Sequence, residues 1–218
     1  MYNPTILKLL TKMEEAIRLI NERTATIQNV NDFLTTPGGV MRRDSVITVL
    51  VGLGGAVNSI DKQTKGGYLK IYPSIPWQQI IGMRNVLAHE YFDVDTDIIF
   101  KTVKEDIPEL SKILTVMKDD MLKEKNIYDS LVTAIINRAS DCSAKTFDDE
   151  TKEKMLNYLA KNAKNTIEKK EIVSTIWKDA DVILSENRIE QEWRNDTKEE
   201  LFELAEGKVR DQSQGWKW

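Results

Sequence analysis

The residues best suited to chemistry lie in one short segment, from Ile75 to Asp95, which contains the only histidine of the chain. Arg84 precedes His89 by five positions, and Tyr91 follows it by two. An imidazole titrates near neutral pH and can act as a general base, whereas a planar guanidinium can hold two oxygens of a phosphate group. Together these two side chains are suited to chemistry at a phosphodiester.

The spacing of the two residues limits how they can cooperate. On an ideal helix, side chains five positions apart point about 140° away from each other. Asn85 and His89, four positions apart, share a face. The arginine must therefore reach around the helix, the helix must unwind near Ala88, or a second copy of the chain must contribute to the same cleft. We favour a two-fold dimer, because it brings two arginine and histidine pairs together.

The elements around this segment are predicted to be helices. Apolar residues recur at three- and four-residue spacing over residues 4–23, 41–60, 76–91 and 95–117. Asn3 and Asp95 are expected to act as helix N-caps, and Pro108 to bend its helix or remove one backbone hydrogen bond. Because no strand pattern or nucleotide-binding glycine loop occurs, the first half of the chain is predicted to be a helical bundle of four or five members.

Glycine and proline qualify this assignment in two places. Pro37, Gly38 and Gly39 are expected to break any helix that forms before residue 41. Gly52, Gly54 and Gly55 lie inside a strong helical pattern, although each glycine lowers helix propensity. Their presence predicts that another helix packs very close to this one.

The second half of the chain also has a helical pattern. Thr146 and Thr197, each followed by acidic residues, are expected to begin two of its helices, and Gly207 to end the last one. Trp216 and Trp218 close the chain, either as packed or unstructured ends or as a peptide that docks on a partner. The whole chain is therefore predicted to be all-α, with a helical bundle in residues 1–123 and a helical extension in residues 124–218.

Composition excludes several classes of protein and site. A single cysteine, Cys142, excludes an internal disulfide, and one histidine with one cysteine cannot supply the usual zinc ligands, although carboxylates could still hold magnesium. No apolar run could cross a bilayer, so we expect a cytoplasmic protein. A pI near 5.3 disfavours a nonspecific nucleic-acid coat. Residues 41–70 are nevertheless net +3 (5 − 2), which fits a solvated helix face or an edge that contacts phosphates.

The central segment closely resembles a known family. The run Gly82-Met83-Arg84-Asn85-Val86-Leu87-Ala88-His89-Glu90-Tyr91 resembles the R-x4-H-x-Y signature of the HepT-like (DUF86) branch of the HEPN superfamily. The likeness extends to Ile75-Pro76-Trp77, to Phe92-Asp93-Val94-Asp95 and to the run from Val103 to Leu110, and covers roughly residues 1–120.

This resemblance implies an all-α, dimeric and metal-independent endoribonuclease without a cofactor, which serves as the toxin of a two-gene toxin–antitoxin module. Its partner would be a minimal nucleotidyltransferase (MNT) antitoxin, and its substrate would be RNA. Arg84 and His89 would be catalytic, and Asn85 would shape the polar site. Tyr91 would be the hydroxyl that the antitoxin modifies with AMP.

One position departs from the family pattern and keeps a second interpretation open. The second family helix usually reads I-G-E-A, whereas this chain has Leu53-Gly54-Gly55-Ala56, so Gly55 removes a carboxylate. The alternative is a noncatalytic helical dimer that binds a nucleotidyltransferase or presents a substrate to it. Gly55 and the acidic pI favour this alternative, and the intact Arg84, Asn85, His89 and Tyr91 favour the ribonuclease.

Overall fold

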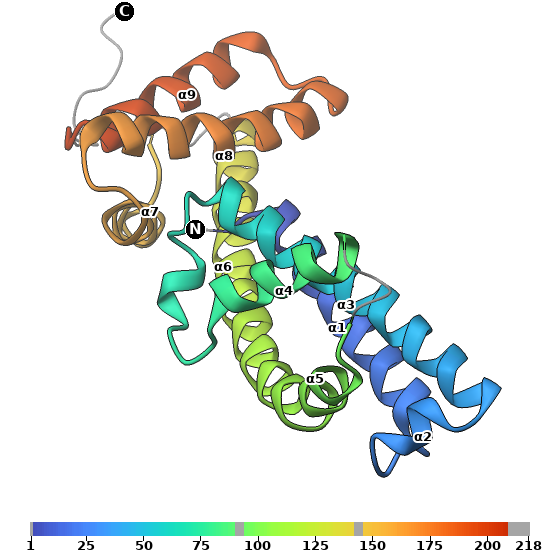
Figure 1. Cartoon of the computed structure of the whole chain (residues 1–218). Coiled ribbons are helices and arrows are strands. Elements are labelled where there is room, and N and C mark those ends of the chain that lie inside the picture. Colours follow the sequence, from blue (N-terminus) through green and yellow to red (C-terminus); the bar gives the residue numbers. More distant parts are fainter. Residues whose placement is uncertain (1, 90–93, 142–145, 209–218) are drawn as a thin grey trace, which may run out of the picture. The chain divides into compact units, whose positions relative to one another are not determined.

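The prediction of an all-α protein is confirmed in the computed structural model (Figure 1). The structure describes residues 2–89, 94–141 and 146–208, and none of these residues belongs to a strand. Contacts along the chain define two compact units, an N-terminal unit from Asn3 to Leu122 and a C-terminal unit that begins at Lys123 and includes Tyr2. Each unit has its own core, so each is described by itself.

The N-terminal unit is built from α-helices joined by short connections. Their bounds are α1 Pro4–Thr24, α2 Asn31–Leu34, α3 Pro37–Gln63, α4 Trp77–His89, α5 Thr96–Lys101 and the first part of α6 Ile107–Ser140. A 3₁₀ turn, Leu69–Ile71, lies between α3 and α4. Helix α1 packs on α3, and α3 packs on α4. The side chain of Asn3 caps α1 as predicted, accepting hydrogen bonds from the backbone of Thr5 and Ile6.

The predicted start of the second long helix near residue 41 is wrong, although the short helix α2 does end at Leu34, before Pro37. Helix α3 begins at Pro37 itself, because Thr36 forms the N-cap and its hydroxyl accepts the Gly39 N–H at 3.0 Å. The N–H groups of the first helical turn have no intrahelical partner, so proline, which lacks an N–H, loses no hydrogen bond there. Pro37 can therefore begin a helix, whereas a proline in the middle of a helix would break it. The earlier start lengthens α3 to 27 residues, and it ends at Gln63.

Asp95 and Pro108 act close to their predicted roles. The Asp95 carboxylate accepts the Asp97 N–H at 2.8 Å and so caps α5. A π-helical turn, Thr102–Asp106, separates α5 from α6, whose second residue is Pro108. The wider turn accommodates a residue that cannot donate a backbone hydrogen bond to the preceding turn. Residues 95–140 therefore run as three successive helical pieces.

The C-terminal unit contains the rest of α6 and three further helices, α7 Asp149–Asn162, α8 Thr166–Glu186 and α9 Gln191–Ala205. Both predicted threonine caps are wrong. Asp148 caps α7 through the Thr151 N–H, and Thr197 lies buried in the middle of α9, where its hydroxyl donates to the Trp193 carbonyl. Gly207 follows the end of α9 with a φ of 80°, as a C-terminal glycine should. Trp216 and Trp218 lie outside the described residues.

Arg138 of α6 is the most buried cation of this unit. Its side chain, 2% exposed, donates to the carboxylates of Glu200 and Asp196 on α9. Glu200 also accepts the Phe147 N–H at 2.8 Å. Burial raises the pKa of Glu200, while the Phe147 N–H and the Arg138 guanidinium oppose that rise. This cluster ties α9 to α6 and to the segment before α7.

Removing the buried cation should destabilise the protein strongly. We expect Arg138→Met to lower the free energy of unfolding by about 3–5 kcal/mol, because it leaves Glu200 as a buried charge without its cation. Urea unfolding of the full chain, followed by circular dichroism, measures this loss. As a control, Lys154→Met removes an exposed pair with Glu150 and should cost less than about 1 kcal/mol.

The same loss should depend on pH. A carboxyl group with a raised pKa binds its proton more tightly in the folded chain, so folding becomes more favourable as the pH falls through that pKa. A neutral Glu200 needs no cation, and the deficit of Arg138→Met should shrink in acid. A deficit that stays constant from neutral to acidic pH would contradict this account.

Candidate functional site

Helix α4 carries the candidate residues, and its first residue anchors it. Trp77 is buried, and its indole N–H donates to the Tyr72 carbonyl at 2.8 Å. Tyr72 is in turn tied to α6, because its hydroxyl donates to Asp120 at 3.1 Å. Leu87 is the other buried residue of α4. The helix is thereby fixed at its start and along the side that packs on α3.

Arg84 lies on the side of α4 that faces α3, and it is half-buried. Its Cβ lies so close to Gly54 that a Cβ added to the glycine would be 2.4 Å away. At the other end of the side chain, Nη1 donates to the Asn85 side-chain oxygen at 3.0 Å. The Nε atom is buried and has no hydrogen-bond partner among the described residues. A buried donor without an acceptor costs about 1–3 kcal/mol, so this nitrogen lowers the stability of the folded chain.

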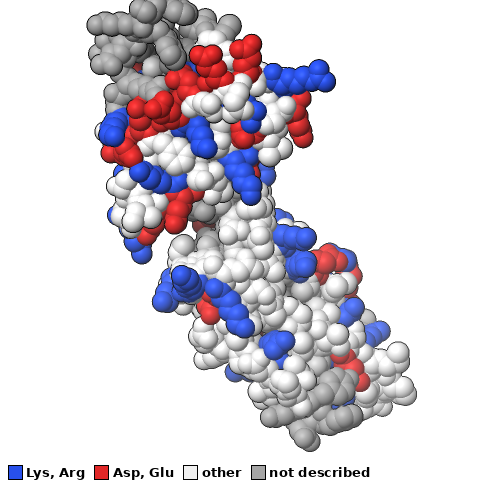
Figure 2. Space-filling model, turned by 90° about the horizontal axis from the view of Figure 1, so that it is seen from above, with Lys and Arg blue, Asp and Glu red and all other residues white. Residues whose placement is uncertain are grey.

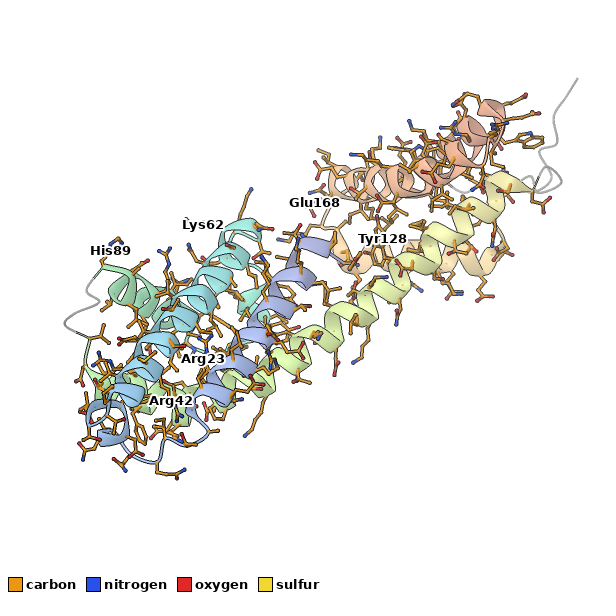
Figure 3. All side chains as sticks on the ribbon, turned by 90° about the vertical axis from the view of Figure 1, so that its right-hand side faces the viewer. Arg23, Arg42, Lys62, His89, Tyr128 and Glu168 are labelled. Atoms are coloured by element: carbon orange, nitrogen blue, oxygen red, sulfur yellow. The ribbon has the colours of Figure 1, made fainter. Side chains whose placement is uncertain are left out.

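His89 is the last residue of α4 and is exposed to solvent (Figure 3). Asn85 is exposed as well. The α-helix continues through Ala88, so the structure does not bear out unwinding at that residue. The Arg84 head group reaches Asn85, the residue that shares a face with His89. Tyr91 lies outside the described residues.

A groove of about 670 Å³ runs beside Arg84, between α3, α4, α5 and the start of α6. Most of its lining is apolar, with Arg84 and Lys101 as the cations on its walls. Two of its lining residues, Val86 and Ile98, are 49% and 54% exposed. Exposed apolar side chains beside a groove are typical of a surface that another macromolecule covers.

Sequence reasoning did not find this groove. Ile98 belongs to the apolar stripe of the helix predicted over residues 95–117, and that pattern assigns it to the core. The π-helical turn that follows α5 interrupts the period of 3.6 residues. A single apolar stripe drawn through residues 95–117 therefore does not predict which side chains are buried. Lys101 stands between Phe100 and Thr102, and nothing in this local sequence marks it as part of a groove.

The basic residues between 41 and 70 lie elsewhere. Arg43 pairs with Asp44 at 2.9 Å, and none of the five basic residues of this range lines the groove beside Arg84. On the face that Figure 2 shows, blue side chains of the N-terminal unit are scattered over a largely white surface. Lys62 extends from α3 in Figure 3. These cations therefore lie outside the groove that contains Arg84.

Among the described residues, no group of three or more histidine, cysteine, aspartate or glutamate side chains is placed to hold a metal ion. In the same part of the chain, no helix is both long and apolar enough to cross a membrane.

Comparison with known proteins addresses the N-terminal unit. The profile of the family described as "Ribonuclease HepT-like" matches residues 13–117. "Probable ribonuclease HepT" of Thermococcus cleftensis is 40% identical over 101 residues, which are 46% of this chain and 84% of that protein. "Putative RNase MJ1380" of Methanocaldococcus jannaschii is 34% identical over 82 residues, which are 38% of this chain and 69% of that protein. No solved structure matches the chain.

The matched residues contain the whole of α3, α4 and α5, and with them Arg84, Asn85, His89 and the groove beside Arg84. The relatives are covered over most of their own length. Through its N-terminal unit, this chain belongs to the HepT-like ribonuclease family.

Proposed function

We propose that this protein is a metal-independent endoribonuclease, the toxin of a HEPN/MNT toxin–antitoxin module that acts in the cytoplasm. Membership in the HepT-like ribonuclease family supports RNA as the substrate. The observation that carries the proposal is the state of Arg84, whose buried Nε has no acceptor among the described residues. We further propose residues 1–123 as the HepT-like HEPN domain and residues 124–218 as an appended helical region.

The proposed chemistry needs only one base and one cation. A neutral His89 imidazole removes the proton from an RNA 2′-hydroxyl, and that oxygen attacks the adjacent phosphorus. The bond from phosphorus to the 5′ oxygen breaks, which leaves a 2′,3′-cyclic phosphate, and the departing oxygen takes up a proton to become a 5′-hydroxyl. Arg84 donates to the nonbridging oxygens, whose negative charge grows in the transition state. Asn85 holds the guanidinium from the side that it shares with His89.

A two-fold dimer would complete the site. Arg84 is turned toward α3 and the groove, whereas His89 stands exposed at the end of α4. The groove carries exposed apolar side chains together with both cations and carboxylates, which is the mixture that a self-complementary surface needs. Under this proposal, each protomer covers the groove of the other and brings its Arg84 and His89 into one shared cleft.

The noncatalytic alternative is favoured by the acidic pI and by the glycine at position 55. That position, however, lines a shallow groove between α1 and α3 together with Gly52 and Ser59. It does not line the groove that contains Arg84. The carboxylate that this chain lacks would therefore stand on a different face of α3, which supports the catalytic reading.

The first test is cleavage of RNA in the presence of EDTA. We expect the wild type to cut and to leave 2′,3′-cyclic phosphate ends. His89→Ala should lower the rate by about 10²–10⁴, the usual contribution of a general base. Gln78→Ala, an exposed position of the same helix outside the groove, is the control and should cut normally. Undiminished cleavage by His89→Ala would refute the mechanism, and absence of cleavage by the wild type would favour the noncatalytic dimer.

The dimer is tested by a charge placed in the groove. We expect Ile98→Glu to yield monomers in sedimentation equilibrium and to abolish cleavage, because the carboxylate would have to be buried at the interface. Ile71→Glu is the matched control, since Ile71 is 64% exposed in the same unit and lies outside the groove. It should remain dimeric and active. A dimer that survives Ile98→Glu would show that the groove is not the interface.

The proposed off-switch is AMP attached to Tyr91 by the MNT antitoxin. Bulk and negative charge beside His89 would exclude RNA phosphate by steric clash and repulsion. Incubation with ATP and the nucleotidyltransferase should add the mass of AMP to the peptide that contains Tyr91, and the modified protein should cut no RNA. Tyr91→Phe should gain no mass and should stay active with the antitoxin and ATP present. Mapping of the added mass to another residue would refute this switch.

A further inference from the structure

Gly54 of α3 lies against α4 beside Arg84. A Cβ added to Gly54 would lie 2.4 Å from Arg84 Cβ, 3.1 Å from Arg84 Cγ and 3.2 Å from the Ile80 carbonyl oxygen. The first of these distances is shorter than any that real Cβ atoms adopt. The stem of Arg84 and the backbone one turn earlier therefore fill the volume that a side chain at position 54 would need.

The neighbouring glycines show that this closeness is specific to one position. Gly52 and Gly55 stand in the same helix, and a Cβ added to either would meet no atom within 4 Å. A glycine inside a helix lowers stability relative to alanine, so helix propensity alone would favour alanine at each of these positions. Of these three glycines, only Gly54 lies where a side chain would clash with a neighbouring helix. The residue that occupies this space is Arg84.

Arg84 is held at both ends as a consequence. Its stem is fixed against the backbone of α3, and its head group donates to Asn85. Between these two points lies the buried Nε. The depth at which the guanidinium sits thus follows from how closely α4 approaches α3.

We propose that Gly54 is a positioning residue for the RNA cleavage reaction, because its missing side chain sets the place of the Arg84 guanidinium. This inference rests on the function proposed above. Gly54 touches no reacting atom and acts only through Arg84. A methyl group at position 54 cannot be accommodated by moving the tip of a flexible side chain, since its nearest neighbours are stem carbons and a backbone oxygen. Helix α4 has to shift at Arg84.

The main test compares three single methyl additions to one helix. Gly54→Ala should lower kcat for RNA cleavage by about 10²-fold, the usual effect of misplacing a catalytic group by about 1 Å, and should change KM less. Gly52→Ala and Gly55→Ala should cleave at the wild-type rate. All four proteins are assayed well below their melting temperatures, so that the folded fraction is the same. A normal kcat for Gly54→Ala would overturn the inference.

A second test separates positioning from general damage. Arg84→Gly removes both carbons that the new methyl group meets, and free guanidinium can then be supplied in solution to replace the lost head group. The guanidinium-dependent rate should be equal in Arg84→Gly and in Gly54→Ala/Arg84→Gly, because the free cation is not attached to α4. A rescued rate that falls in the double variant would show that Gly54→Ala damages the site by another route, and would overturn the inference.

Thermal unfolding distinguishes failure of this inference from failure of the proposed function. Gly54→Ala should lower the melting temperature more when Arg84 is present than in the Arg84→Gly background. Equal losses in both backgrounds would show that the two residues do not interact, whatever the activity of the protein. Absence of cleavage by the wild type would overturn the proposed function and the role of Gly54 in it. Cleavage by the wild type and by Gly54→Ala at equal rates would overturn this inference alone.

Discussion

The close approach of α3 and α4 at Gly54 is the constraint on which the candidate site depends. Helices normally pack with side chains between them, at axial distances set by those side chains. Here the Cβ of Arg84 occupies the place of the side chain that Gly54 lacks. An arginine at such a contact keeps its stem buried while its head group extends toward the surface. One missing methyl group thus determines both how the bundle packs and how deeply its proposed catalytic cation lies.

The helices themselves were largely predictable, because the N-terminal unit follows simple rules. Helix α1 buries Ile6, Leu10, Met13, Ile17 and Ile20, which recur at helical spacing. Asn3 and Asp95 cap their helices through side-chain oxygens, as expected from their types and positions. The predicted start of α3 near residue 41 was too late for a physical reason. Proline is favoured in a first turn and disfavoured later, so its effect depends on Thr36, whose hydroxyl makes the cap.

Helix boundaries in the C-terminal unit were predicted less well. Thr146 and Thr197 satisfy the capping pattern, but Asp148 caps α7 and α9 begins at Gln191. The first turns of α9 are polar and carry no apolar period, so the pattern begins only where the helix meets its core. Glu200 follows Thr197 at the spacing of a capping box, yet it is buried against Arg138, 62 residues away. A pairing between residues so far apart in the chain cannot be predicted from the local sequence.

A related contrast separates Arg138 from Arg84, two of the arginines that the fold buries in part or in full. Arg138 donates to two carboxylates of α9, and its charge is compensated within the chain. Arg84 has an amide oxygen at one nitrogen and a buried Nε without an acceptor among the described residues. A chain that needed Arg84 only for stability would do better with a neutral side chain, since a buried donor without a partner is a net cost. Sequence identified the residue, and the packing against Gly54 accounts for where the stem of its side chain lies.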